Sequence, residues 1–322
     1  MKTLAYIVLA AVALAAPLFV YPVLIMKVLC FALFACAFNL LLGYTGLLSF
    51  GHAAFFGTAA YVAGHTMKVW GLPPELGLLA GTAAAAALGY GFGALAIRRS
   101  GIYFAMVTLA LAQMMYFVFL QAPFTGGEDG LQGVPRGRLL GVIDLTSDLN
   151  LYYVILAIFL AGFGMIYRTV HSPFGQILKA IRENEARAVS LGYDVAKFKL
   201  LAFVLSAALA GLAGATKTLV FKFATLTDAH WHMSGEVVLM NLLGGMGTVF
   251  GPIVGAATIV TLQNSLADKV GSLVTTIMGG IFIVCVLVFR RGIVGEAARL
   301  YQEIAGRRPR GEARAAAEGE AA

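Results

Sequence analysis

Charged residues are scarce in this sequence. Of its 322 residues, 12% are charged and 60% are hydrophobic, whereas about a quarter of a soluble domain is charged. Apolar runs of about 17 residues or more, long enough to cross a bilayer, recur along the chain. This composition excludes a soluble protein and predicts an all-α, polytopic membrane protein. The net charge of +7 comes from bases that flank apolar runs, which is typical of membrane orientation and not of nucleic-acid binding.

Several kinds of site chemistry are also missing. The three cysteines lie in apolar runs without metal-ligand spacing, and His230 and His232 have no third ligand nearby, so no metal site is predicted. No Walker motif is present, so we expect ATP to be bound by partner chains, and we expect this chain to be neither an enzyme nor a cofactor protein. The acids Glu75, Asp228, Glu236 and Asp268 fall at predicted span ends or in loops, which disfavours an ion relay.

Eight membrane spans are predicted from the apolar runs: 4–21, 24–42, 53–67, 76–97, 102–122, 151–167, 200–220 and 270–289. They belong to a permease domain over residues 1–299. The cytoplasmic tail, 300–322, is rich in Arg, Ala, Glu and Gly, which predicts disorder. The first run also resembles a signal peptide, although a first span anchored by Lys2 explains it equally well.

The basic residues orient these spans. Placing the arginine pairs 98–99 and 290–291 and the basic loop 168–199 in the cytoplasm puts most lysines and arginines inside. A further apolar stretch, 236–262, must then begin and end on the outer side. This predicts a re-entrant pair of half-helices broken at residues 244–252, and the alternative is one kinked span.

A glycine-rich motif occurs twice. The stretch NLLLGYTGLLSFG begins at Asn39, and NLLGGMGTVFG begins at Asn241. Glycine permits unwound backbone, and broken helices border the pathway in many transporters. We therefore predict a translocation pathway lined by Asn39, Gly43, Tyr44, Thr45, Gly46, Ser49, Gly51, His52, Asn241, Gly244, Gly245, Gly247, Gly251 and Pro252. The alternatives are that the glycines only pack helices and that His52 only satisfies buried backbone groups.

The loop 168–199 is predicted to contain a short amphipathic helix between Pro173 and Gly192. Charged residues surround an apolar stripe, which consists of Ile177, Ala180, Ile181, Ala188 and Leu191. Such a helix can lie on the membrane surface or insert into a groove on another protein. It can also simply connect two spans.

Five stretches carry a family resemblance: ENEARAVSLGYDVAKFKLLAFVLSAALAGLAGA (183–215), NLLLGYTGLLSFGHAAFFGTAAYVAG (39–64), GIYFAMVTLALAQ (101–113), TGGEDGL (125–131) and VVLMNLLGGMGTVFGPIVGAA (237–257). Together they resemble branched-chain amino acid ABC transporter permeases, the Liv family. GIYFAMVTLALAQ with TGGEDGL points to the LivM-like subunit. Residues 185–192 are similar to the E-A-A-x3-G coupling signature, but Arg187 replaces the second Ala and Gly192 comes one residue late.

The resemblance implies an ABC importer permease fold, a bacterial inner-membrane location, and import of branched-chain or other hydrophobic amino acids. It implies a LivH-like permease partner, two ATPase subunits beneath, and a periplasmic binding protein above. The ATPase groove would take Arg182, Glu183, Asn184, Glu185, Arg187, Leu191 and Gly192. The outer loop 123–150 would contact the binding protein through Gly126, Gly127, Glu128 and Asp129, although these residues also fit a plain glycine-rich turn.

Other functions fit parts of the pattern. Related permeases that take urea, amides or aromatic acids have the same architecture. A passive aquaporin-like channel would also carry two re-entrant half-helices with Asn, but here Leu follows each Asn, and a channel needs no helix in the loop 168–199. A secondary carrier is disfavoured by the scarcity of acids within the spans.

Overall fold

The computed structural model describes residues 20–270 and, outside that range, residues 16–17, 276–277, 279–280, 283 and 292–296. Helices make up most of this part of the chain. In order they are α2 (Pro22–Thr45), α3 (His52–Lys68), α4 (Pro74–Ala96), α5 (Ile102–Gln121), α6 (Asp148–His171), α7 (Pro173–Glu183), α8 (Glu185–Ser190), α9 (Val195–Phe221), α10 (Leu226–Ala229), α11 (Trp231–Gly244) and α12 (Gly251–Val270).

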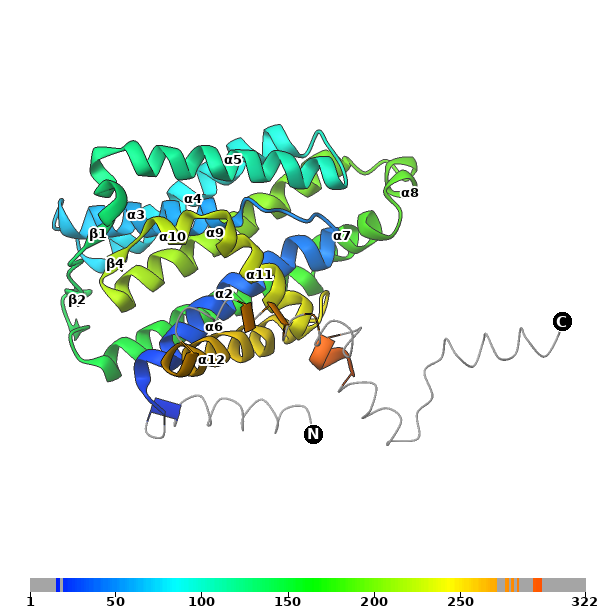
Figure 1. The fold of residues 1–322 in the computed structure, drawn as a ribbon. Coiled ribbons are helices and arrows are strands. Elements are labelled where there is room, and N and C mark those ends of the chain that lie inside the picture. Colours follow the sequence, from blue (N-terminus) through cyan, green and yellow to red (C-terminus); the bar gives the residue numbers. More distant parts are fainter. Residues whose placement is uncertain are drawn as a thin grey trace.

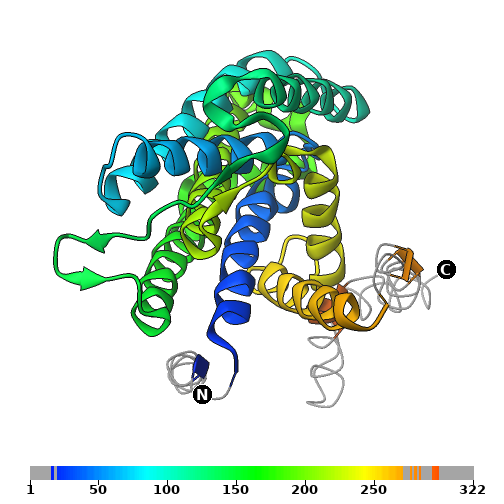
Figure 2. The ribbon, with the colours of Figure 1, turned by 60° about the vertical axis from the view of Figure 1, so that its left-hand side comes forward.

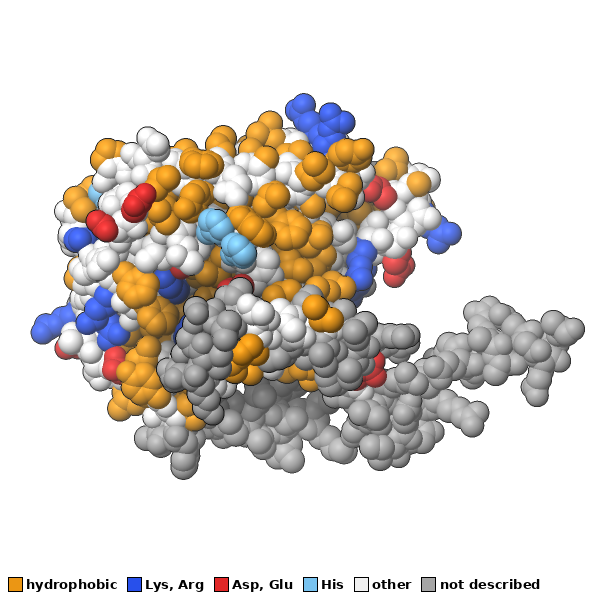
Figure 3. Space-filling model, in the orientation of Figure 1, with side chains coloured by type: hydrophobic (Ala, Val, Ile, Leu, Met, Phe, Trp, Pro, Cys, Tyr) orange, Lys and Arg blue, Asp and Glu red, His pale blue; other side chains and the backbone are white. Residues whose placement is uncertain are grey.

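The long helices run between two ends of the molecule (Figure 1). One end holds α7 and α8, and the other holds four short strands: β1 (Leu131–Gln132), β2 (Arg138–Leu139), β3 (Ile143–Asp144) and β4 (Phe223–Ala224). We call them the α7–α8 end and the strand end. Charged side chains gather toward these two ends, and hydrophobic ones cover much of the face between them (Figure 3). This distribution suits a protein whose middle contacts lipid.

Six predicted spans coincide with helices. Five of these, α2, α4, α5, α6 and α9, are long and apolar enough to cross a membrane. The helix α3, with 17 residues, occupies the predicted span 53–67. The predicted spans 4–21 and 270–289 and the tail 300–322 lie wholly or largely outside the described residues. The total of eight spans therefore stays a prediction.

The helices α2 and α9 form the centre of the bundle and pack against each other and against α3. Small residues allow this close approach: a Cβ atom at Gly214 of α9 would lie 2.1 Å from the Phe56 carbonyl oxygen of α3. Such contacts are typical of helices packed in membranes. The helices α4 and α5 instead expose many large apolar side chains, among them Leu79, Tyr103 and Phe117, which suits a lipid-facing side.

Side-chain caps divide the segment between α6 and α9. The Asn184 side chain accepts a hydrogen bond from the Arg187 N–H at 2.9 Å, and the Asp194 side chain accepts one from the Lys197 N–H at 3.2 Å. The Lys197 ammonium lies 2.8 Å from Asp194, and its hydrogen bond lowers the pKa of that carboxyl group. The predicted single helix from Pro173 to Gly192 is wrong in one respect. Asn184 leaves the helical conformation to cap α8, since Asn is a strong N-cap residue.

The loop 123–150, which is predicted to lie on the outer side, is folded and not a bare turn. Strand β1 pairs with β4, which follows α9, and the Val134 N–H donates to the Lys222 carbonyl at 2.9 Å. Two 3-10 turns, Pro123–Thr125 and Gly127–Asp129, precede β1. The β2–β3 hairpin projects from the helical body (Figure 2, green arrows). The strand end therefore holds the loop to the segment after α9.

Candidate functional site

The structure contains both predicted helix breaks. The first break comprises residues 46–51, between α2 and α3, and the second comprises residues 245–250, between α11 and α12. The helices α11 and α12 pack against each other. That this pair enters and leaves the membrane on the same side stays a prediction.

The second break is fastened to α2 by Asn39. The Asn39 side-chain amide donates to the Thr248 carbonyl at 2.8 Å, and the Gly247 N–H donates to Asn39 Oδ1 at 3.0 Å. Asn39 is only 3% exposed. A Cβ atom at Gly43 would lie 2.8 Å from the Gly247 nitrogen, so α2 touches the second break directly. Backbone groups freed by the break thus find partners from a distant helix.

Arg182 of α7 lies beside both breaks. Its Nη1 donates a hydrogen bond to the Gly43 carbonyl, and a Cβ atom at Gly247 would lie 3.1 Å from the same nitrogen. A Cβ atom at Gly46 would lie 3.3 Å from Arg182 Cγ. Hydrogen bonds from a charged donor are stronger than neutral ones. One side chain of the predicted coupling segment therefore bonds to the end of α2 and lies beside the second break.

Two glycines are required for this arrangement by their backbone conformation. Gly46 has φ 76° and Gly247 has φ 74°, in the left-handed region that other residues adopt only with strain. Both lie against Arg182. Side chains at these positions would strain the backbone and crowd the guanidinium.

A pocket of about 440 Å³ opens where α2, α7 and the second break meet; its lining is Gly43, Tyr44, Lys179, Arg182, Glu183 and Gly247. Small-molecule sites commonly measure about 300–1,000 Å³. The Lys179 ammonium lies 5.7 Å from the centre of the Tyr44 ring, within the range of a cation–π contact. Lys179 and Arg182 outweigh the single acid Glu183, so the lining carries a net positive charge, which favours an anionic group such as a carboxylate.

Other predicted pathway residues of the first motif lie away from this pocket. The Thr45 hydroxyl donates to the Leu41 carbonyl, and the Ser49 hydroxyl accepts from the Gly51 N–H at 3.1 Å. His52 is fully buried, and its Nε2 lies 2.8 Å from the Ser206 hydroxyl. Its ring packs edge-on against three aromatic rings, those of Phe38, Phe55 and Phe203. This placement favours the structural interpretation of His52.

The second motif contains glycines that pack helices. A Cβ atom at Gly244 would lie 1.9 Å from the Gly251 carbonyl oxygen, and one at Gly251 would lie 2.6 Å from the Gly245 carbonyl oxygen. Pro252 is buried in the first turn of α12, where its missing N–H is tolerated. Asn241 donates to the Ala35 carbonyl at 3.1 Å and to the Val237 carbonyl at 2.8 Å.

The predicted ATPase-coupling residues form an exposed tip. Arg182, Glu183, Asn184, Glu185, Arg187, Leu191 and Gly192 are all exposed as residues. Apolar side chains accompany them: Val189 is 58% exposed, Leu191 68% and Tyr193 40%. A small apolar cluster of Ile181, Ala188 and Val195 fastens α7 and α8 to α9. The tip is therefore held in place and presents mixed apolar and charged side chains outward.

The predicted binding-protein contact lies at the strand end. Glu128 and Asp129 are exposed on the 3-10 turn Gly127–Asp129. The Thr125 hydroxyl donates to the Ala122 carbonyl at 2.7 Å, and a Cβ atom at Gly126 would lie 2.4 Å from the Gly130 carbonyl oxygen. The turn is thus tightly built and presents two carboxylates outward.

Sequence reasoning missed a buried ion pair at the strand end. Lys217 Nζ lies 2.7 Å from Asp228 Oδ2, and the two side chains are 8% and 4% exposed. Asp228 also accepts hydrogen bonds from the Thr225 N–H and hydroxyl, at 3.0 and 3.2 Å. Two signals pointed to it: a lysine inside an apolar run, and the capping pattern Thr225-x-x-Asp228.

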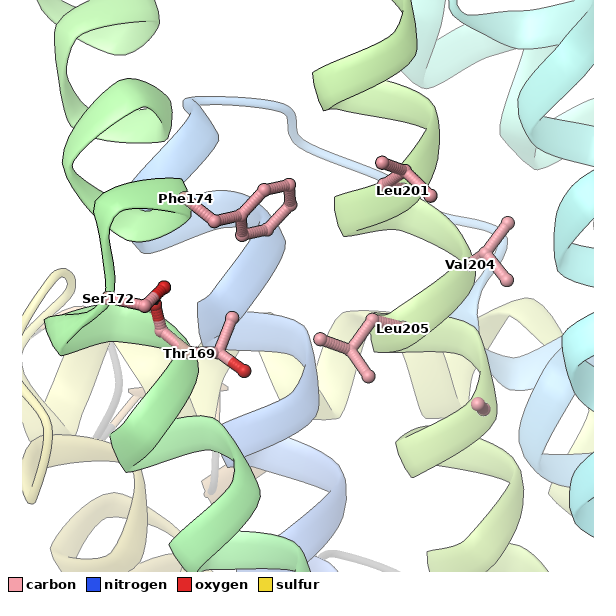
Figure 4. Close-up of a pocket in the computed structure, with 7 residues that line it drawn as sticks. Thr169, Ser172, Phe174, Leu201, Val204 and Leu205 are labelled. Carbon is pink, nitrogen blue, oxygen red and sulfur yellow. Dashed lines mark hydrogen bonds between the residues drawn. The ribbon is translucent and has the colours of Figure 1, made fainter.

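A second depression lies between the α6–α7 junction and α9. Thr169, Ser172 and Phe174 face Leu201, Val204 and Leu205 across it, with α2 behind (Figure 4). Its lining is almost entirely apolar. Such a surface suits lipid or a neighbouring helix and not a zwitterionic solute.

Comparison with known proteins supports the family resemblance. The family model "Branched-chain amino acid transport system / permease component" matches residues 23–289. The chain is 29% identical over 258 residues to the high-affinity branched-chain amino acid transport system permease protein LivM of Escherichia coli, covering 71% of this chain and 60% of that protein. It is 24% identical over 285 residues to BraD of Pseudomonas aeruginosa, covering 82% of this chain and 91% of that protein.

A sugar permease is similar as well. The ribose import permease protein RbsC of Bacillus subtilis is 28% identical over 195 residues, which cover 56% of this chain and 58% of that protein. No solved structure matches the chain. The chain spans about 60% of the length of the LivM relatives that it matches. The family match covers most of the chain, which therefore belongs to the branched-chain amino acid transport permeases and is a LivM-like ABC permease.

Proposed function

We propose that this chain is a permease subunit of an ATP-driven importer in the bacterial inner membrane and forms half of the translocation pathway. The observation that carries the proposal is the position of Arg182. It belongs to the segment expected to bind an ATPase, it bonds to Gly43 just before the first break, and it lies beside Gly247 in the second break. A movement of α7 would therefore reach both breaks through one side chain.

The exposed tip is the surface for the ATPase. Its apolar side chains Val189, Leu191 and Tyr193 suit insertion into a groove, and the charges of Glu183 and Arg187 beside them suit the polar rim of an interface. Closure of two ATPase subunits on ATP would shift α7 and α8. The pathway opens to one side or the other only if the tip makes different contacts in the two states.

The remaining partners follow from the family. A LivH-like permease subunit would supply the other half of the pathway, and a periplasmic binding protein would deliver substrate at the strand end. The exposed carboxylates of Glu128 and Asp129 are the groups we propose for that contact. Basic side chains on the binding protein would complement them.

Branched-chain amino acids are the proposed substrates. LivM and BraD carry that substrate in their names, and RbsC carries ribose in its name. The cationic pocket beside Gly43 suits an amino acid carboxylate better than an uncharged sugar. Urea, amides and aromatic acids are the alternative substrates.

Reconstitution tests this function. The chain is placed in liposomes with its permease partner, the two ATPases and a leucine-loaded binding protein, and labelled leucine uptake is measured. We expect uptake that requires ATP and no flux through this chain alone. Solute flux through this chain alone, without ATP, would support the passive channel instead.

A variant of the tip tests the coupling role. Replacing Glu185 with Gln, which keeps an acceptor for the buried Lys199, together with Gly192→Ala should abolish uptake while membrane insertion stays normal. The matched control is Asp194→Asn, at the edge of the same tip, which keeps an α9 cap and should retain uptake. Unchanged ATP-driven uptake in the Glu185 and Gly192 variant would refute the coupling role.

A further inference from the structure

One face of α9 carries three polar anchors. Lys199, Ser206 and Lys217 are buried, and they are separated by seven and eleven residues. At 3.6 residues per turn these spacings place all three on one side of the helix. Lys199 and Lys217 lie five full turns apart, or about 27 Å along the axis.

Each anchor reaches a different part of the molecule. Lys199 Nζ lies 2.7 Å from Glu185 Oε1 of α8, in the tip proposed for the ATPase. Lys217 lies 2.7 Å from Asp228 of α10, beside the strands. Figure 1 shows α9 running from the α7–α8 end to the strand end. A single helix therefore bears an ion pair at each end of the bundle.

The middle anchor holds α9 to both helices that flank the first break. The Ser206 hydroxyl donates to the Ala37 carbonyl of α2 at 2.6 Å. Because this uses the only hydroxyl hydrogen, the 2.8 Å contact with His52 Nε2 of α3 has the histidine as donor. Both Ser206 and His52 are fully buried.

The outer ion pair is built into the strand end. Asp228 closes the capping box of α10, and Lys217 Nζ lies 4.4 Å from the centre of the Phe223 ring in β4. Strand β4 pairs with β1 of the outer loop that carries Glu128 and Asp129. Displacement of Lys217 along the axis would therefore pull on α10, β4 and the outer loop together.

We propose that α9 is a strut that links the ATPase-binding tip to the strand end, with Lys199 and Lys217 as its positioning residues. The proposal rests on the proposed function. A loaded binding protein at the strand end and ATP at the tip would then influence each other through α9. Such coupling is reciprocal, so binding-protein stimulation of ATP hydrolysis reports it.

The test uses the full complex in liposomes and measures ATP hydrolysis with and without a leucine-loaded binding protein. The outer variant carries Lys217→Met with Asp228→Asn, which removes both buried charges and keeps a capping acceptor at position 228. Replacing both partners avoids the strong destabilisation caused by one uncompensated buried charge. A thermal unfolding midpoint close to that of the wild type shows that this variant is folded.

The inner variant is Lys199→Met, which leaves Glu185 in contact with solvent, since its side chain is 51% exposed. In either variant we expect the stimulation of ATP hydrolysis by the loaded binding protein to fall about fivefold or more, while basal hydrolysis persists. The matched control is Lys197→Met. This lysine is 79% exposed, lies two positions from Lys199 on another face of α9, and should leave stimulation unchanged.

Combining the inner and outer variants distinguishes one strut from two separate effects. Two links in series fail when either is broken, so the combined variant should lose no more stimulation than the worse single one. The strut would be overturned if the combined variant lost stimulation by the product of the two single losses. Full stimulation in a folded outer variant would overturn it too. If the wild-type complex takes up leucine with ATP but shows no stimulation, only the strut fails; if it shows neither uptake nor stimulation, the proposed function fails as well.

Discussion

The two breaks have similar sequences and different supports. In the first break, the Phe50 N–H donates to the Thr108 hydroxyl of α5 at 3.1 Å, and Ser49 bonds locally to Gly51. The second break depends on Asn39, which comes from the first motif. The first motif thus stabilises the second break, whereas Asn241 of the second motif bonds to α2 away from either break. The two copies of the repeated sequence therefore have different structural roles.

The largest expected effect on stability is at the contact between α11 and α12, on either side of the second break. Gly244→Ala would place a Cβ atom 1.9 Å from the Gly251 carbonyl oxygen, so α11 and α12 must separate. We expect the free energy of unfolding to fall by about 3 kcal/mol. Thermal unfolding of the purified protein measures this loss. The control is Gly164→Ala in α6, where no described atom lies within 4 Å of the new Cβ, so stability should not fall.

The two asparagines should differ in transport. Asn39→Ala leaves the Gly247 N–H and the Thr248 carbonyl without their side-chain partner. Each unpaired buried group costs about 1–3 kcal/mol of stability. We expect uptake to fall about tenfold. Asn241→Ala should lower uptake only about twofold. It loses the donations to the Ala35 and Val237 carbonyls but also removes an Oδ1 atom that has no partner among the described residues. Equal losses in both variants would show that the two motifs have equivalent roles.

The smallest effect separates backbone strain from contact with Arg182. Gly46→Ala and Gly71→Ala both place a side chain at a positive φ, which is 76° at Gly46 and 64° at Gly71. The resulting backbone strain should lower the free energy of unfolding by about 1 kcal/mol in each variant. Only the Cβ atom at Gly46 would contact Arg182, whereas no described atom lies within 4 Å at Gly71. Uptake assays should therefore show about a twofold loss for Gly46→Ala and none for Gly71→Ala. A loss shared by both would mean that strain alone matters.

Local features of the fold were predictable from the sequence. Apolar runs located six described helices, and the glycine clusters located both breaks, because hydropathy and backbone conformation depend on neighbouring residues. The division at Asn184 of the helix predicted from Pro173 to Gly192 was missed. Its capping role competes with helix continuation, and hydrophobic periodicity does not report that competition.

Contacts between distant residues were beyond sequence reasoning. Asn39 and Thr248 are 209 positions apart, and Arg182 and Gly43 are 139 apart. Such pairs depend on how whole helices pack, which no local pattern encodes. The Lys217–Asp228 pair was missed for a related reason, since Asp228 was read as a loop acid and its burial follows from the folding of α10 against α3.

The central claim is that Arg182 transmits movement of α7 and α8 to both breaks. The direct test is Arg182→Ala in the reconstituted complex, with leucine uptake and ATP hydrolysis measured together. The account predicts uptake per ATP hydrolysed reduced about tenfold or more, because the other tip residues still bind the ATPase while the bond from Arg182 to Gly43 is lost. Uptake per ATP equal to that of the wild type would contradict it.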